Sequence, residues 1–222
     1  MLVAFDLDDT LYKEADFACS AYREIAALAE VDFGLDSDGA FAAMAGALSR
    51  KENPFDALEA FAGRALPVAE WVRRYRIHRP TIALSDGVGA LLDRLKAQGC
   101  RLAVVTDGRS LTQRNKIEAL GLSRWIDGDD ILISEETGAD KTLPDNFVAL
   151  ERRYPGEQWV YVGDNPAKDF YHPNRRGWMT VCLADSGRNI HPQTVTDAEH
   201  AAQFTIREPE ELPAILEKIQ KR

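Results

Sequence analysis

Apolar runs of strand length recur along the chain, and none of them alternates strictly with polar residues. Strands that are buried on both faces show this pattern, as in parallel sheets covered by helices. From residue 84 onward, stretches with helical periodicity separate the runs. This alternation predicts an α/β fold with a three-layer, Rossmann-like core built on a parallel sheet. The expected strands are Leu2–Phe5, Leu102–Val105, Ile131–Ile133, Trp159–Val162 and Met179–Leu183.

Helices are predicted between these strands from apolar spacing and from residues that favour helix ends. Ser85 is a candidate N-cap for the first of them, and Gly99 is a candidate stop. The second is expected to bury one face formed by Leu111, Ile117 and Leu120. Two more are expected over residues 144–154 and 212–219.

Residues 13–83 interrupt the alternation, because only helical periodicity is visible there. The pair Asn53-Pro54 is typical of a helix start. The economical interpretation is an all-helical cap domain of residues 13–83, inserted into a core made of residues 1–12 and 84–222. Such an insert is expected to roof a site at the sheet edge. Its core is expected to contain Phe17, Phe41, Phe55, Phe61 and Trp71.

Composition narrows the range of partners. The chain has 222 residues, 45% of them hydrophobic, and a formal charge of −9. An acidic chain is a poor partner for nucleic acid, which is usually bound by a basic face. No apolar run reaches bilayer length, so we expect no membrane partner and a cytoplasmic location. The three cysteines are far apart and are expected to be small buried hydrophobic residues: Cys19, Cys100 and Cys182.

Polar clusters follow the apolar runs or the loops after them. The carboxyl ends of parallel strands meet at one edge of a sheet, where open α/β sheets bind their ligands. The clusters are therefore expected to lie close together. They are Asp6 with Asp8, Thr106 with Asp107 and Gly108, Lys141, and Asp164 with Asp169.

This collection of side chains favours the binding of a metal ion and an anion. Carboxylates that lie close together repel, and an oxygen-rich acidic site without Cys or His suits a hard cation such as Mg²⁺. The Thr106 hydroxyl and the free amides of Asp107 and Gly108 are candidates to hold phosphate oxygens, with Lys141 supplying positive charge.

The order of the clusters resembles that of the haloacid dehalogenase superfamily of phosphohydrolases. One motif alone is weak, whereas four in order span nearly the whole chain, and residues 13–83 match the position of that family's helical cap. The first motif is Asp6-Leu7-Asp8-Asp9-Thr10, the second Thr106-Asp107-Gly108, the third Lys141, and the fourth Gly163-Asp164 with Asp169.

The resemblance implies a role for each matched residue. Asp6 would be the nucleophile that forms an aspartyl phosphate, and Asp8 the general acid and base. Mg²⁺ would be held by the Asp6 carboxylate, the Asp8 backbone carbonyl and Asp164. Asp169 would orient the water shell of the metal or Lys141.

Each residue also has an ordinary structural interpretation. Asp8, Asp9 and Thr10 are typical of residues that cap a turn, and Asp9 is expected to do only that. Lys141 alone would be one solvated lysine among many, and Asp169 is also typical of a helix N-terminus. Only the ordered set favours catalysis.

Other functions share parts of this chemistry. A two-component receiver domain also phosphorylates an aspartate, but it places its paired acids and acceptor in a different order and is shorter. A dehalogenase proper uses the same nucleophile but, by resemblance, lacks an acid at the position of Asp8. The presence of Asp8 therefore favours phosphoryl chemistry. A phosphomutase stays open, although Thr10 favours hydrolysis by resemblance. We therefore expect a magnesium-dependent phosphatase of a small phosphorylated metabolite, either a sugar phosphate or a nucleoside monophosphate. The oligomeric state is left open.

Overall fold

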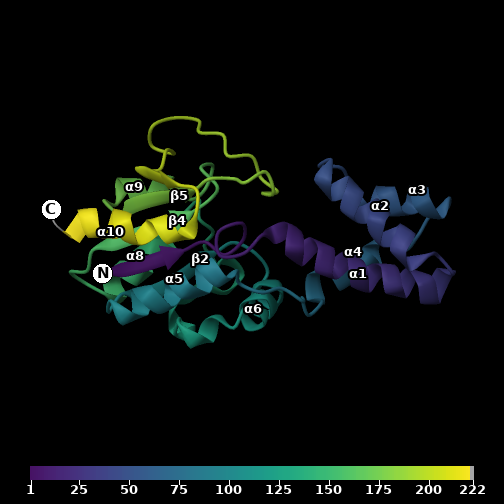
Figure 1. Ribbon diagram of the computed structural model, residues 1–222, viewed down its shortest axis with the longest axis horizontal. Coiled ribbons are helices and arrows are strands. Elements are labelled where there is room, and N and C mark those ends of the chain that lie inside the picture. Colours follow the sequence, from purple (N-terminus) through teal and green to yellow (C-terminus); the bar gives the residue numbers. More distant parts are fainter. Residues whose placement is uncertain (221–222) are drawn as a thin grey trace.

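Six parallel strands form one sheet in the order β3-β2-β1-β4-β5-β6 (Figure 1). The structure is a computed structural model and describes residues 1–220. Its sheet confirms the predicted α/β class. The three-residue strand β6 is an addition that the sequence pattern did not predict. The strands are β1 (Leu2–Phe5), β2 (Arg101–Thr106), β3 (Ile131–Ile133), β4 (Trp159–Gly163), β5 (Met179–Leu183) and β6 (Phe204–Ile206).

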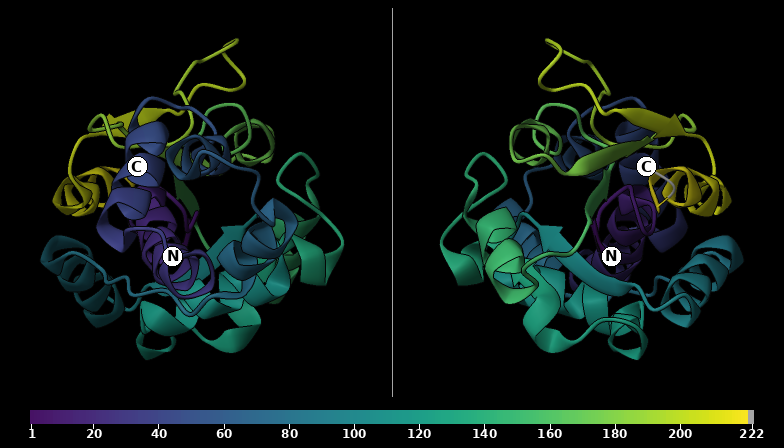
Figure 2. Two further views of the ribbon diagram at one scale, coloured as in Figure 1. Left: turned by 90° about the vertical axis from the view of Figure 1, so that its right-hand side faces the viewer. Right: turned by 90° about the vertical axis from the view of Figure 1, so that its left-hand side faces the viewer.

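Helices cover both faces of the sheet, as the absence of polar alternation predicted. In β1, Val3 and Phe5 belong to one hydrophobic cluster, while Leu2 and Ala4 belong to another on the opposite face. Figure 2, which looks along the long axis, shows helices on both sides. The first face packs on α5 (Asp86–Ala97), α6 (Ser110–Ala119) and α10 (Leu212–Gln220), and the second on α8 (Asp145–Arg153) and the segment around α9 (Tyr171–Arg175). Short helices complete the core: η1 (Leu122–Arg124), η2 (Gly128–Asp130), α7 (Ser134–Thr137) and η3 (Pro209–Glu211).

Four helices lie apart from the sheet, at the end of the molecule opposite both termini (Figure 1). We call them the four-helix segment. Local signals explain their ends, since the side chains of Asp36 and Asn53 accept amide hydrogen bonds at two helix starts, and Gly34 and Gly63 end two helices in left-handed conformation. The helices are α1 (Glu14–Phe33), α2 (Ser37–Ser49), α3 (Pro54–Ala62) and α4 (Val68–Ile77).

The four-helix segment has its own hydrophobic cluster, with Met44, Leu58 and Trp71 at its centre. Two of the aromatic residues expected there lie elsewhere. Phe61 is 43% exposed, and Phe17 joins the cluster under the sheet. Phe17 lies at the start of α1, where the chain leaves the core, which explains its different partners.

The buried face of α6 differs from the predicted one. Leu111 is 55% exposed, so its assignment to the buried face was wrong. Gln113 and Lys116 are buried instead, beside Ile117 and Leu120. Two long polar side chains therefore point inward from this helix, and each needs a polar partner.

The cysteines largely follow the expectation from composition. Cys100 and Cys182 are buried, whereas Cys19 is only half-buried, so the expectation holds for two of the three. Among the described residues, no helix combines the length and the apolar character that crossing a membrane requires.

The sheet order places the crevice for a ligand between β1 and β4. The chain leaves β1 for β2 on one side and returns later to add β4 on the other, which makes this pair the switch point of the topology. Asp6 follows β1 and Asp164 follows β4, so both leave the sheet at the same edge. The four-helix segment lies beyond this edge (Figure 1).

Candidate active site

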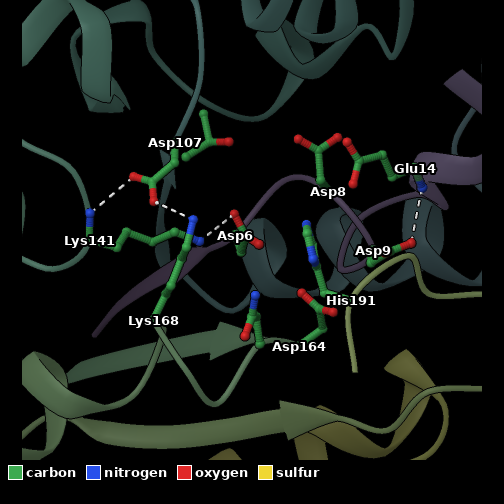
Figure 3. A pocket seen from close by; sticks show the side chains of 11 residues that line it. Asp6, Asp8, Asp9, Glu14, Asp107, Lys141, Asp164, Lys168 and His191 are labelled. Atoms are coloured by element: carbon green, nitrogen blue, oxygen red, sulfur yellow. Dashed lines mark hydrogen bonds and ion pairs between the residues drawn. The ribbon is translucent and has the colours of Figure 1, made fainter. Parts of the chain in front are cut away.

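A small cavity of about 110 Å³ opens at the switch point. Figure 3 shows acidic side chains and two lysines converging on it. Of the predicted site residues, Asp169 lies behind the cavity wall and is fully buried, and Gly108 is not part of the lining. The lining comprises the predicted Asp6, Asp8, Thr106, Asp107, Lys141 and Asp164, together with Asp9, Glu14, Asn165, Lys168 and His191.

Lys141 joins two buried carboxylates. Its Nζ lies 2.8 Å from Asp6 Oδ1 and donates to Asp169 Oδ1 at 2.6 Å. Burial alone would lower the pKa of Lys141, but the charges of Asp169 and Asp6 raise it well above its usual value. The two carboxyl groups therefore favour the charged form of Lys141 at the base of the cavity.

Asp169 is fixed by the turn after β4. Its Oδ2 accepts hydrogen bonds from the amides of Asp164 at 3.0 Å and Asn165 at 2.8 Å. A side chain at Gly163 would overlap the Asp169 carboxylate, so this approach requires glycine. Because Asp169 uses both oxygens on protein donors, it suits the task of orienting Lys141.

Asp6, Asp164 and Asp169 form a compact acidic cluster whose carboxylate oxygens lie within 4.8 Å of one another. Burial, with repulsion from Asp169, raises the pKa of Asp6 to about 7. Burial, with repulsion from Asp6 and Asp169, raises the pKa of Asp164 to about 8. Such crowding is relieved when a divalent cation binds, and all-oxygen donors fit Mg²⁺.

Asp164 is also held from the long loop between β5 and β6. Asn189 Nδ2 donates to Asp164 Oδ2 at 2.8 Å, and Asn189 Oδ1 accepts from Lys13 Nζ at 2.8 Å. One end of this chain of contacts is thus the carboxylate, and the other is the residue just before α1.

Asp8 has a different environment from that of Asp6. Lys116 Nζ lies 2.7 Å and 2.9 Å from its two oxygens, Gln113 Nε2 donates to Oδ2 at 3.0 Å, and the Tyr12 hydroxyl donates to Oδ1. Burial by itself would raise the pKa of Asp8, but the charge of Lys116 and these hydrogen bonds outweigh it and lower the pKa below its usual value.

The loop after β2 only partly matches its predicted role. Thr106 lines the cavity, and its hydroxyl accepts from Gln113 Nε2 at 2.7 Å. The amide of Gly108 donates to Ser134 Oγ at 2.9 Å, so the expectation that it is free for phosphate was wrong for this conformation. Asp107 accepts from the amide of Lys141 at 3.0 Å and therefore shapes the loop that carries the lysine.

Asp9 has the structural role that the sequence predicted. Its backbone is left-handed, with φ 55°. One oxygen accepts from the amide of Glu14 at 3.0 Å and the other from that of Ile190 at 2.9 Å. Asp9 thereby ties the start of α1 to the long loop.

The sequence analysis missed several side chains around the cavity. Gln113 and Lys116 are spaced three apart and so lie on one face of α6. This spacing is common among exposed polar residues, and it points to the site only once their burial is known. Asn189 and His191 come from the irregular loop after β5, where no periodic pattern exists to place them. Lys168, which lies 3.7 Å from Asp107, reads in the sequence as an ordinary surface lysine.

A comparison with protein families decides the membership. The model of haloacid dehalogenase-like hydrolases matches residues 1–170, which include all four predicted motifs. The chain belongs to this family. It is thus a hydrolase, as the resemblance implied.

Relatives and solved structures agree with this membership. The glyceraldehyde 3-phosphate phosphatase of Methanocaldococcus jannaschii is 29% identical, over 99% of this chain and 98% of its own. The ribulose-1,5-bisphosphate 5-phosphatase of Halopiger xanaduensis is 29% identical, over 83% and 84% of the two chains. A magnesium-bound haloacid dehalogenase-type hydrolase from Bacillus subtilis superposes with a TM-score of 0.68 at 24% identity, over 97% of each chain, and shows the same fold.

Proposed function

We propose that this protein is a magnesium-dependent phosphatase of a small sugar phosphate that acts through an aspartyl phosphate on Asp6. The observation that carries the proposal is that Asp6 and Asp8 both line one cavity. Asp6 Oδ1 lies 2.8 Å from Lys141 Nζ, and Asp8, two positions on, lies outside the acidic cluster. Relatives that match 99% and 83% of the chain act on sugar phosphates by name.

The reaction divides into two displacements. In the first, an Asp6 oxygen bonds to phosphorus and the bond from phosphorus to the sugar oxygen breaks. Asp8, whose pKa is low in the free protein, takes up a proton when the substrate binds and gives it to that sugar oxygen. In the second, Asp8 takes a proton from water, whose oxygen bonds to phosphorus while the bond to Asp6 breaks. Inorganic phosphate leaves and both carboxyl groups return to their starting state. Thr106 and Lys141 hold the phosphoryl oxygens through both steps.

The acidic cluster fits the metal that this family uses. Asp6 and Asp164 are the carboxylates that would hold Mg²⁺, with the Asp8 backbone carbonyl as the further ligand that the family resemblance implies. Asp169 would serve it indirectly, because both of its oxygens already accept hydrogen bonds. When bound, Mg²⁺ neutralises negative charge, so that an anionic phosphate can enter.

The four-helix segment is proposed as the cap domain, within residues 13–83. It lies beyond the edge of the sheet where the cavity opens, and Glu14 at its start lines the cavity (Figures 1 and 3). In this role the segment covers the phosphate, excludes water that would compete with the sugar, and contacts the leaving group.

The test is a panel of phosphate esters assayed for phosphate release with Mg²⁺. The panel contains triose, pentulose and hexose phosphates and nucleoside monophosphates. We expect wild type to prefer a sugar phosphate and Asp6→Asn to be inactive. Loss of an enzyme nucleophile costs on the order of 10⁶-fold in kcat. The exposed Asp38→Asn serves as the matched control. Phosphate release that survives in Asp6→Asn would contradict the nucleophile assignment.

A further inference from the structure

Asp8 is held by side chains that none of the motifs contains. Lys116 and Gln113 both come from α6, and their exposed fractions are 3% and 2%. Lys116 contacts both oxygens of Asp8, and Gln113 contacts one. A buried lysine is costly unless it is paired, and in the part of the chain that the structure describes Asp8 is the carboxylate that pairs with it.

Gln113 relates Asp8 to the phosphate-contacting hydroxyl. Its Nε2 donates both to Asp8 Oδ2 at 3.0 Å and to Thr106 Oγ1 at 2.7 Å. One amide group therefore sets the position of the proposed acid relative to Thr106. The side chain of Asp8 keeps 19% of its surface exposed, on the side of the cavity.

Lys116 also touches the start of the four-helix segment. Its Nζ lies 4.4 Å from the centre of the Phe17 ring, and that ring packs on Tyr75 and His78 at the end of α4. Asn115, the neighbour of Lys116, donates to the carbonyl of His78 at 3.0 Å. α6 thus holds Lys116 between Asp8 and the two ends of the four-helix segment, which are the start of α1 and the end of α4.

We infer that Lys116, assisted by Gln113, is a positioning residue that fixes the Asp8 carboxyl group where it exchanges a proton with the leaving oxygen of the substrate. This role rests on the proposed phosphatase function and adds residues that the four motifs do not include. A general acid acts only within hydrogen-bond reach of the atom it protonates, and a carboxyl group free to rotate would spend much of its time elsewhere. Two donors on one helix hold it in a single orientation.

The leaving group separates positioning from mere structural support. An alkyl phosphate such as glycerol phosphate needs a proton on its leaving oxygen, whereas p-nitrophenyl phosphate has a leaving group that departs without one. The value of kcat/KM reports the steps up to release of the alcohol. Damage to the acid therefore lowers kcat/KM for the alkyl ester selectively, while damage to the fold lowers both values alike.

The experiment compares Lys116→Met with wild type on both esters in the presence of Mg²⁺. We expect kcat/KM for glycerol phosphate to fall about 10²-fold, near the lower end of what a general acid contributes, and that for p-nitrophenyl phosphate to fall less than about fivefold. Arg114→Met is the matched control, because Arg114 lies on the same helix and pairs with Glu136 at the surface. Its two values are expected to stay at wild-type level.

A double-mutant cycle with Asp8→Asn sharpens the result. If Lys116 acts through Asp8, Lys116→Met changes the ratio of the two kcat/KM values no further once Asp8 is Asn. Should Lys116→Met fail to fold, as judged by its thermal transition, Gln113→Met is measured in the same way and is expected to shift the ratio in the same direction.

Three outcomes would overturn the inference. An equal fall for both esters would make Lys116 a structural residue. Wild-type kcat/KM values for both esters in Lys116→Met and Gln113→Met would remove the positioning role while the phosphatase function stands. Phosphate release by wild type from neither of these two esters nor any member of the sugar phosphate panel would defeat the proposed function, and this role with it.

Discussion

The edge of the sheet and the four-helix segment are built on opposite principles. At the edge, the buried Lys141 lies within hydrogen-bond distance of two buried carboxyl groups, those of Asp6 and Asp169. In the four-helix segment the interior is apolar, and the ion pairs of Glu70 with Arg73 and Arg74 are 41–56% exposed. Buried charges are a poor source of stability, whereas apolar packing is a good one. The edge is therefore arranged for chemistry, and the segment for a stable shape.

The two regions meet at the start of α1. Burial, with repulsion from Asp8, raises the pKa of Glu14 to about 8. Phe17 lies under Lys116, and Lys13 holds Asn189. The segment also contacts the core at the end of α4, where Asn115 of α6 donates to the carbonyl of His78 at 3.0 Å.

After the loss of the nucleophile in Asp6→Asn, the largest effect is expected from removing the cation of the edge. Lys141→Met leaves two buried carboxylates without their shared partner and removes a contact to the phosphoryl group. Loss of one such stabilising donor typically costs 10²–10³-fold in kcat, so we expect a fall of about 10³-fold in phosphate release. The exposed Lys96→Met should have wild-type activity. A fall smaller than about tenfold in Lys141→Met would mean that the edge does not depend on this charge.

The second prediction concerns the interior of the four-helix segment. Leu58 is fully buried there, and Leu58→Ala is expected to lower the free energy of unfolding by about 2–5 kcal/mol, measured by urea denaturation. Below the transition, kcat for p-nitrophenyl phosphate should stay within about threefold of wild type, because no reacting group has moved. Val31→Ala, at a position 81% exposed on α1, should change the unfolding free energy by less than about 0.5 kcal/mol.

A loss of kcat in Leu58→Ala as large as that in Lys141→Met would break the comparison. It would show that the interior of the segment takes part in the chemistry directly.

The smallest expected effect is on thermal stability as pH and metal change. The folded-state pKa values of Asp6 and Asp164 are raised to about 7 and 8 from a usual 3.8. Raised carboxyl pKa values add stability that is fully present below about pH 4 and is lost as pH rises through 7 and 8. We therefore expect the melting temperature of the metal-free protein to fall by a few degrees between about pH 6 and pH 8.

Mg²⁺ is expected to reverse this loss, because it binds the ionised carboxylates. The rise in melting temperature on adding Mg²⁺ should be larger at pH 8 than at pH 6, and should shrink in Asp164→Asn. A rise that is the same at both pH values would show that Mg²⁺ does not bind this cluster.

The sequence predicted the edge of the sheet better than the side chains that support it. Strand ends are visible as apolar runs, so Asp6 and Asp164 were placed without coordinates. Lys116 and Gln113 were not, because hydrophobic periodicity assigns polar residues of a helix to its surface and took Leu111 for the buried face. The burial of Lys116 and Gln113 depends on Asp8, which is at least 105 positions away in the sequence. The local sequence pattern of α6 therefore cannot predict it.

The same reasoning explains the other differences. Phe61 and Phe17 have the spacing of interior residues, but the spacing does not tell which neighbours their helix faces contact. Phe61 is exposed, and Phe17 is buried against the core of the sheet. Asn189 lies in a long loop that is ordered by contacts with Asp164 and Lys13, and such contacts leave no periodic trace. Side-chain contacts between residues far apart in the sequence are thus the feature of this molecule that hydrophobic periodicity does not predict.

The central claim is that the Asp6 carboxylate carries the phosphoryl group during turnover. Asp8→Asn should slow the second displacement, so the intermediate accumulates when this variant is mixed with Mg²⁺ and p-nitrophenyl phosphate and quenched in acid. Mass spectrometry of the N-terminal peptide is predicted to find one phosphoryl group on Asp6. Absence of a phosphorylated protein at every quench time, or its location on another residue while phosphate is released, would contradict the claim.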